Sequence, residues 1–108
     1  MKDIPEKIKK TIPTSQQIFA VLSDNDELLR VRGVRRIGLF GSFARNQGRA
    51  RSDLDFLVEF EQPTFDNYMN LAFSLEKLFG RHVDLVTSDG LSSHVRPYIE
   101  KEVLWYEA

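Results

Sequence analysis

The chain of 108 residues contains no cysteine, which excludes disulfide bonds and permits a cytosolic location. Its two histidines, His82 and His94, have no spacing to each other that suggests a zinc site, and we interpret both as structural. No apolar run approaches the length of a membrane span, and the charged start of the chain, MKDIPEKIKK, lacks the apolar centre of a signal peptide. These absences predict a soluble, cytoplasmic protein without a membrane partner.

A large excess of charge of either sign is also absent. The chain has 15 Lys and Arg against 16 Asp and Glu, a net charge of −1, so we expect no direct binding of nucleic acid. The positive charges are unevenly distributed, however, because an acid-free stretch between Leu28 and Ser52 is rich in arginine. It contains Arg30, Arg32, Arg35, Arg36, Arg45, Arg49 and Arg51. Such a stretch would attract a triphosphate or another anionic partner.

The sequence has no internal repeat and no low-complexity linker. Its length suits one domain, residues 1–108, with a single hydrophobic core, and residues 1–13 are expected to form a loose lead-in with Pro5 and Pro13. Hydrophobic periodicity predicts an α/β (α+β) fold with a mixed sheet of three or four strands and helices packed against one face.

The predicted strands are rich in β-branched and other apolar residues. They are Val34–Phe40, Asp53–Phe60, Arg81–Thr87 and an edge strand, Val103–Tyr106. The clearest helix is Phe65–Phe79, whose apolar residues share one face and which Gly80 ends. Three shorter helical segments are predicted: one capped by Thr14 or Ser15 that runs to about Leu22, one with a capping box of Asp24 and Glu27 that runs to about Arg32, and one over Ser92–Lys101 that Pro97 interrupts.

Gly41 and Ser42 directly follow the first predicted strand, and Phe43–Arg45 is typical of the first turn of a helix. A strand, a tight turn and a helix start bring backbone N–H groups and the positive end of a helix dipole to one point, which suits a phosphate group. Gly41 has no Cβ to obstruct an anion, and the Ser42 hydroxyl can donate to a phosphate oxygen. Taken alone, a glycine at such a place is more often a simple turn.

Asp53 and Asp55 open the second predicted strand, with ten residues between Ser42 and Asp53. Alternate residues of a strand point to the same face, so the two carboxylates project together while Leu54 faces the other way. Two carboxylates this close repel each other unless a cation lies between them, and Mg²⁺ typically accepts one or two carboxylates together with substrate phosphates. The alternative is a solvated start of the strand.

Asp84 lies inside the third predicted strand, among apolar residues where an unpaired charge is costly. If this strand lies beside the strand of Asp53 and Asp55, the three carboxylates converge on a site for two metal ions. The alternatives are a position at the solvent-exposed end of the strand, or an ion pair with Arg81 or Arg51.

Together, the pattern G-S-x10-D-x-D followed by an acid in a later strand resembles the nucleotidyltransferase superfamily with the DNA polymerase β-like fold. Within it, residues 41–60, GSFARNQGRARSDLDFLVEF, are similar to the minimal nucleotidyltransferase (MNT) family, whose small domains are often encoded beside HEPN-domain proteins. The resemblance covers roughly residues 34–108. Asn46 replaces the usual glycine after the Ala-Arg pair, and asparagine tolerates the same left-handed backbone.

The resemblance implies a role for each matching residue. Gly41 and Ser42 would bind phosphate, Asp53, Asp55 and Asp84 would bind Mg²⁺ or, alternatively, Mn²⁺, and Asp84 would also act as the base. ATP would be the substrate.

The arginines divide into two groups. Arg45, Arg49 and Arg51 lie in the loop between the Gly-Ser turn and the carboxylates and are the expected phosphate contacts. We interpret the other four as a solvated surface, partly balanced by the acids Asp24, Asp26 and Glu27.

Three functions are compatible with the motifs. The resemblance favours an enzyme that attaches AMP from ATP to a hydroxyl of a protein partner, as the antitoxin of a HEPN ribonuclease toxin. The alternatives are an antitoxin that only binds its toxin, which the intact motif disfavours, and a transferase acting on a small molecule, which the lack of an acceptor domain disfavours. The chain also lacks room for a template-binding module, which argues against a polymerase. The sequence leaves a homo- or hetero-oligomer open.

Overall fold

A four-stranded mixed sheet forms the centre of the fold in the computed structural model, which describes residues 12–106. The strands lie in the order β3-β2-β1-β4, in which only β2 and β3 are parallel neighbours. Their bounds are Val34–Phe40 for β1, Leu54–Phe60 for β2, Val83–Thr87 for β3 and Leu104–Tyr106 for β4. The predicted mixed sheet is therefore confirmed, with β3 and β4 at its edges.

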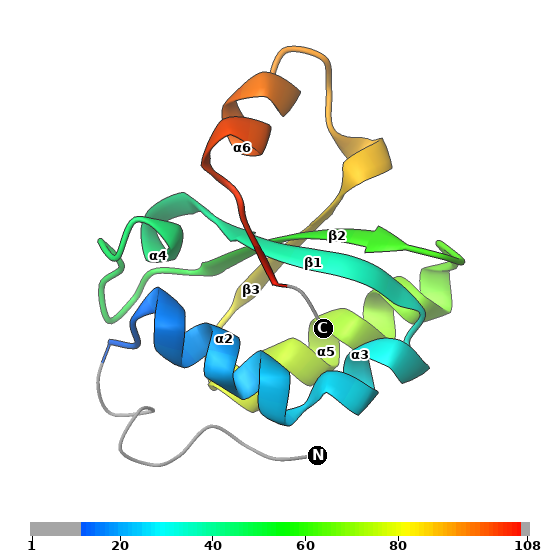
Figure 1. Cartoon of the computed structure of the whole chain (residues 1–108), viewed down its shortest axis with the longest axis horizontal. Helices are drawn as coiled ribbons and strands as arrows, with labels where there is room; N and C mark the ends of the chain where they lie inside the picture. The colour runs from blue at the N-terminus through cyan, green and yellow to red at the C-terminus, as the bar shows by residue number, and fades with distance from the viewer. Residues whose placement is uncertain (1–11, 107–108) are drawn as a thin grey trace.

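Helices lie on both sides of this sheet. Their bounds are Ser15–Asp24 for α2, Asp26–Val31 for α3, Gly41–Ala44 for α4, Phe65–Phe79 for α5 and Arg96–Glu102 for α6, with a 3₁₀ turn, η1, at Ser88–Gly90. As predicted, helices pack against one face, which α2, α3 and α5 cover, whereas α6 and η1 lie on the other side (Figure 1). None of the helices within residues 12–106 is long and apolar enough to cross a membrane.

The core lies between the sheet and the helices α2 and α5. Its fully buried side chains include Ile18, Leu22, Leu39, Leu54, Phe56, Leu71, Leu75 and Leu78. Helix α5 has the predicted bounds because local signals mark both of its ends. The Thr64 hydroxyl accepts a hydrogen bond from the N–H of Asn67, and Gly80 ends the helix with a left-handed φ of 64°.

Two predictions about where helices begin or break are wrong. Helix α6 is not interrupted at Pro97 but begins at Arg96, because proline is tolerated in the first turn, where its missing N–H is not needed. Helix α4 begins at Gly41 rather than Phe43.

The caps of α2 and α3 differ from each other. Thr14 caps α2 through a capping box with Gln17, as one of the two predicted residues, and the helix continues to Asp24. The predicted capping box of Asp24 and Glu27 does not form. Asn25 precedes α3 instead, and its side chain donates to the carbonyl of Val21. Of the predicted lead-in over residues 1–13, residues 1–11 lie outside the described part of the chain.

The edge strand β4 lies against β1 at a glycine. The antiparallel register pairs Gly38 with Trp105 and Leu39 with Leu104. A Cβ at position 38 would meet Val103 Cγ2 at 2.5 Å and Trp105 Cε3 at 2.9 Å, both closer than van der Waals contact allows. The centre of the Trp105 ring also lies 3.6 Å from the Arg36 guanidinium carbon. The absence of a side chain at Gly38 therefore allows β4 to adopt its register.

We expect Gly38→Ala to lower the free energy of unfolding by about 1–3 kcal/mol, because the added methyl group overpacks the contact with β4. Urea denaturation would measure the loss. In a Val103→Ala background, which removes the nearest atom, the same substitution should cost less, and equal costs in both backgrounds would contradict this packing account.

Candidate active site

The backbone turns sharply at Gly41, where β1 ends and α4 begins. Its φ is +75°, a left-handed conformation that favours glycine, and a Cβ at this position would collide with the carboxylate of Asp55. The helix that follows has only four residues, so its dipole is small. The donors at this turn include the backbone N–H of Gly41 and the hydroxyl of the half-buried Ser42.

The parallel pairing of β2 and β3 brings two of the predicted carboxylates together, because its register sets Asp55 opposite Asp84. Leu54 and Phe56 are fully buried in the core, so the alternate residue Asp55 points to the opposite face of the sheet. Asp53 directly precedes β2 and is exposed, as is Asp84. Asp84 thus lies on the solvent-exposed face of its strand.

The environment of Asp55 disfavours its charge. Partial burial, followed by the negative charge of Asp84 and a hydrogen bond shared with it, raises the pKa of Asp55 to about 6, and the charges of Asp53 and Glu102 act in the same direction. Several carboxylates in contact at neutral pH are a suitable ligand set for a divalent cation, because a cation removes their repulsion. The residues therefore fit Mg²⁺ or Mn²⁺.

A histidine also lies among these carboxylates. Ligand atoms of Asp53, His82 and Asp84 all lie within 4.8 Å of one another, which is close enough for one metal ion. His82 Nδ1 is 3.3 Å from Asp53 Oδ2, and its Nε2 is 3.8 Å from a carboxylate oxygen of Glu76. This position of His82 was not predicted from the sequence, in which it was interpreted as a structural residue. Its spacing of two from Asp84, which places both side chains on one face of an extended segment, was the signal that could have identified it.

A carboxylate that the sequence analysis did not consider, Glu102, contacts the Gly41 turn. Its Oε1 accepts a hydrogen bond from the N–H of Gly41 at 3.1 Å, and its Oε2 accepts one from Arg45 Nη1 at 2.8 Å. Of the three predicted phosphate contacts, Arg45 thus lies directly at the turn. Both side chains of the ion pair are partly exposed to solvent.

The loop between α4 and β2 is held by a further arginine. Arg81 Nη1 donates to the carbonyl oxygens of Arg49 and Ser52, and its guanidinium carbon lies 4.9 Å from the centre of the Phe43 ring. The side chains of the predicted contacts Arg49 and Arg51 are exposed along this loop. The alternative prediction that Arg81 neutralises Asp84 is not supported by these contacts.

Asn46 adopts the left-handed conformation expected where the family usually has glycine, with a φ of 56°. Its Oδ1 accepts a hydrogen bond from the N–H of Ser15 at 2.8 Å, so the loop is joined to the start of α2.

Two of the other arginines form surface ion pairs. Arg30 lies 3.2 Å from Asp26, and Arg36 lies 2.9 Å from Glu59.

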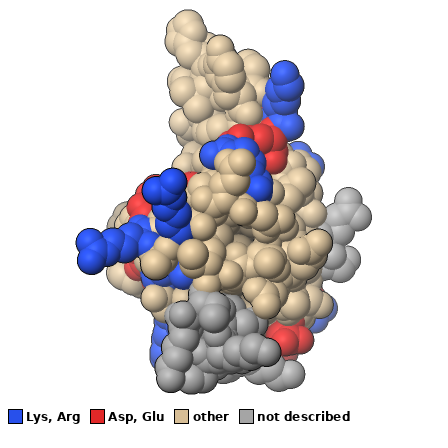
Figure 2. Space-filling view, turned by 90° about the vertical axis from the view of Figure 1, so that its left-hand side faces the viewer, with Lys and Arg blue, Asp and Glu red and all other residues tan. Residues whose placement is uncertain are grey.

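The end of the molecule where α4 lies carries charges of both signs. Figure 2 faces this end and shows basic and acidic side chains next to each other. The candidate site can therefore bind a polyanion through the N–H groups of the Gly41 turn and the guanidinium groups of the loop. It can bind a divalent cation through its carboxylates.

The raised pKa of Asp55 predicts how the metal-free protein responds to pH. In the unfolded chain Asp55 ionises near its ordinary pKa, whereas in the folded protein it keeps its proton up to about pH 6. The folded state therefore binds more protons between these pH values, and its stability falls as the pH rises from about 4 to about 6. Because Asp55 is only partly buried, we expect the loss to be about 1 kcal/mol rather than the full equivalent of the shift.

Urea unfolding in EDTA would measure this loss, and Asp55→Asn should abolish it. Glu59→Gln is the matched control, because Glu59 should have the opposite pH dependence. The hydrogen bond from Arg36 lowers the pKa of Glu59, so the stability that ionised Glu59 contributes is lost as the pH falls. A pH profile that is the same in wild type and Asp55→Asn would contradict the prediction.

Comparison with known proteins identifies the family of this chain. The family described as nucleotidyltransferase domain matches residues 20–106. The protein adenylyltransferase MntA of Thermococcus cleftensis is 38% identical over 94 residues, which cover 85% of this chain and 95% of that protein.

Solved structures share the fold. One that is described provisionally as a minimal nucleotidyltransferase has a TM-score of 0.75 and 33% sequence identity, and the match covers 87% of this chain and 97% of that one. The MNT antitoxin in complex with a tri-AMPylated HEPN toxin of Shewanella oneidensis has a TM-score of 0.61 and 21% identity, covering 82% of this chain and 71% of that one. By sequence and by fold, the chain belongs to the nucleotidyltransferase domain family.

Proposed function

We propose that this protein is a Mg²⁺-dependent protein adenylyltransferase that transfers AMP from ATP to a hydroxyl group of a protein partner. The observation that carries the proposal is the proximity of the Gly41 turn to the paired carboxylates Asp55 and Asp84. A phosphate-binding turn and a cation site at one end of the sheet are the two requirements for nucleotidyl transfer. The similarity to a named protein adenylyltransferase supports the same reaction.

Each group at the site has a task in this reaction. Asp53 and Asp84, whose ligand atoms cluster with those of His82, would hold the cation, Mg²⁺ or Mn²⁺, together with Asp55, which lies opposite Asp84. When bound, the cation neutralises phosphate charge and favours ionisation of the acceptor hydroxyl. The triphosphate would be bound by Gly41 and Ser42 together with the arginines of the loop, namely Arg45, Arg49 and Arg51.

The transfer itself is a displacement at the α-phosphorus. The acceptor oxygen forms a bond to phosphorus, the bond from phosphorus to the oxygen of pyrophosphate breaks, and pyrophosphate leaves. Asp84 accepts the proton of the acceptor hydroxyl, because it is exposed beside the other carboxylates and no arginine within the described residues forms an ion pair with it.

We propose a HEPN ribonuclease toxin as the acceptor, and this chain as its antitoxin. The named relative is a protein adenylyltransferase, and the structural neighbour from Shewanella oneidensis is an MNT antitoxin bound to an AMPylated HEPN toxin. The functional complex is then a hetero-oligomer of the two proteins, and the reaction takes place in the cytoplasm, where ATP is available. The whole chain, residues 1–108, would act as one nucleotidyltransferase domain.

If the carboxylates share a divalent ion, Mg²⁺ or Mn²⁺ should tighten ATP binding by roughly tenfold or more, equivalent to about 1.4 kcal/mol. Calorimetry with and without EDTA would measure the gain. Asp53→Asn combined with Asp55→Asn should remove it and leave the melting temperature unchanged or higher, because the substitutions also relieve repulsion. The metal assignment fails if wild type binds ATP equally well in EDTA and in Mg²⁺.

The transfer is tested with purified protein, ATP and a HEPN-domain partner. AMP units should appear on the partner as discrete mass increments, and Asp84→Ala should reduce the rate by about 10²- to 10⁴-fold, because it removes the base and a metal ligand. The variant should still co-purify with the partner. If Asp84→Ala protects cells from the toxin as well as wild type does and the partner carries no AMP, the protein neutralises by binding alone.

A further inference from the structure

Glu102 occupies the donors that the proposed function assigns to the triphosphate. Its two carboxylate oxygens accept one hydrogen bond each, from the N–H of Gly41 at 3.1 Å and from Arg45 Nη1 at 2.8 Å. A backbone amide and a guanidinium are also the usual partners of a phosphate oxygen. A carboxylate and a phosphate oxygen cannot take the same hydrogen atoms at the same time, so the two ligands exclude each other.

The position of Glu102 follows from the pairing of the sheet. In the register of β1 with β4, Leu39 pairs with Leu104, and extending this antiparallel register by two residues sets Gly41 opposite Glu102. The strand β4 can adopt this register because Gly38 has no side chain that would collide with Val103 and Trp105. The pairing of β1 with β4 therefore positions the Glu102 carboxylate at the Gly41 turn.

The contact of Glu102 with Gly41 and Arg45 can compete with a phosphate group and can also break when a phosphate group binds. The side chain of Glu102 retains 34% of its exposure and that of Arg45 retains 49%, so water can replace both partners when the pair separates. Exposed pairs of this kind contribute little to stability. Both hydrogen bonds are made by the end of the Glu102 side chain, so a change of its rotamer would free the N–H and the guanidinium together.

We propose that Glu102 is an internal competitor of the nucleotide, which fills the phosphate position at Gly41 and Arg45 until a triphosphate displaces it. This inference rests on the proposed function, because it concerns the same site. It assigns one phosphate group of the substrate to the Gly41 amide and the Arg45 side chain. It also makes the affinity for nucleotide lower than the binding groups alone would provide.

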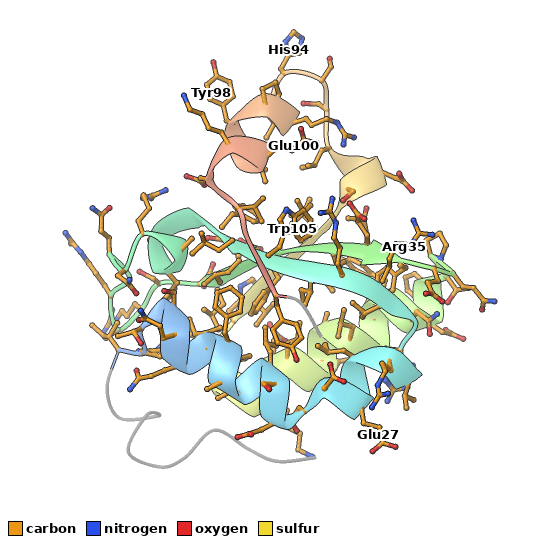
Figure 3. All side chains as sticks on the ribbon, in the orientation of Figure 1. Glu27, Arg35, His94, Tyr98, Glu100 and Trp105 are labelled. Atoms are coloured by element: carbon orange, nitrogen blue, oxygen red, sulfur yellow. The ribbon has the colours of Figure 1, made fainter. Side chains whose placement is uncertain are left out.

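The test compares binding of the Mg²⁺ complex of AMP-PNP, a non-hydrolysable ATP analogue, to wild type and three variants of the full chain by calorimetry. Glu102→Gln keeps the size of the side chain and removes its charge, and Glu102→Ala removes both oxygens. We expect each to tighten binding roughly three- to fivefold, the range expected from losing one exposed ion pair. Glu100→Gln is the matched control, because Glu100 lies on the same helix and pairs with Arg96 instead (Figure 3). It should leave the affinity unchanged.

A second measurement follows the Gly41 amide directly by NMR. The amide resonances of wild type and Glu102→Ala should differ in the free proteins and coincide at saturating nucleotide, because the same phosphate then occupies the amide in both. Unchanged or weaker binding by both Glu102 variants, with wild-type binding intact, overturns the competitor role and leaves the proposed function standing. Equal tightening by Glu100→Gln overturns it as well, since the effect is then general electrostatics. If none of the forms binds the analogue, the proposed function and this inference both fail.

Discussion

The pairing of Asp55 with Asp84 across two parallel strands is the constraint on which the rest of the site depends. Hydrophobic burial sets this register, because Leu54 and Phe56 of β2 point into the core and a shift by one residue would expose them. The free energy gained by burying these apolar side chains therefore holds two like charges close together. The cost appears in the raised pKa of Asp55.

Neither Gly41 nor Arg81 neutralises the negative charge that this pair accumulates. Gly41 provides space for the Asp55 carboxylate by lacking a side chain, and Arg81 stabilises the loop through carbonyl oxygens rather than through the acids. This leaves the carboxylates without a permanent internal cation among the described residues. A site built in this way is adapted to a counter-ion that enters with its substrate.

The sequence was sufficient for most of the fold. The strands around the site and the helix Phe65–Phe79 were predicted because each has a strong periodic pattern and clear end signals. The error at Asp24 arose because the adjacent Asn25 can also precede the helix, and the error at Pro97 arose because a proline can either interrupt a helix or stand in its first turn. These are differences of a few residues in boundaries, the least certain part of any such prediction.

The candidate site was only partly predictable. Asp53, Asp55 and Asp84 were identified from their spacing along strands, whereas Glu102 contacts Gly41 across 61 residues of sequence, and only the register of β4 reveals it. Arg81 was considered as a partner of Asp84, but its hydrogen bonds go to the loop. Side-chain contacts between distant segments depend on strand order, which local patterns do not contain.

The asparagine at position 46 has a consequence for how the loop behaves before any ligand arrives. A glycine there would adopt the same backbone but would have no acceptor for the N–H of Ser15. Ordering a residue costs about 1–2 kcal/mol of conformational entropy, and a loop that is already joined to helix α2 has lost part of this freedom during folding. Nucleotide binding then has to offset a smaller loss of conformational entropy in the loop. Asn46 thus makes this segment more preorganised than a glycine would.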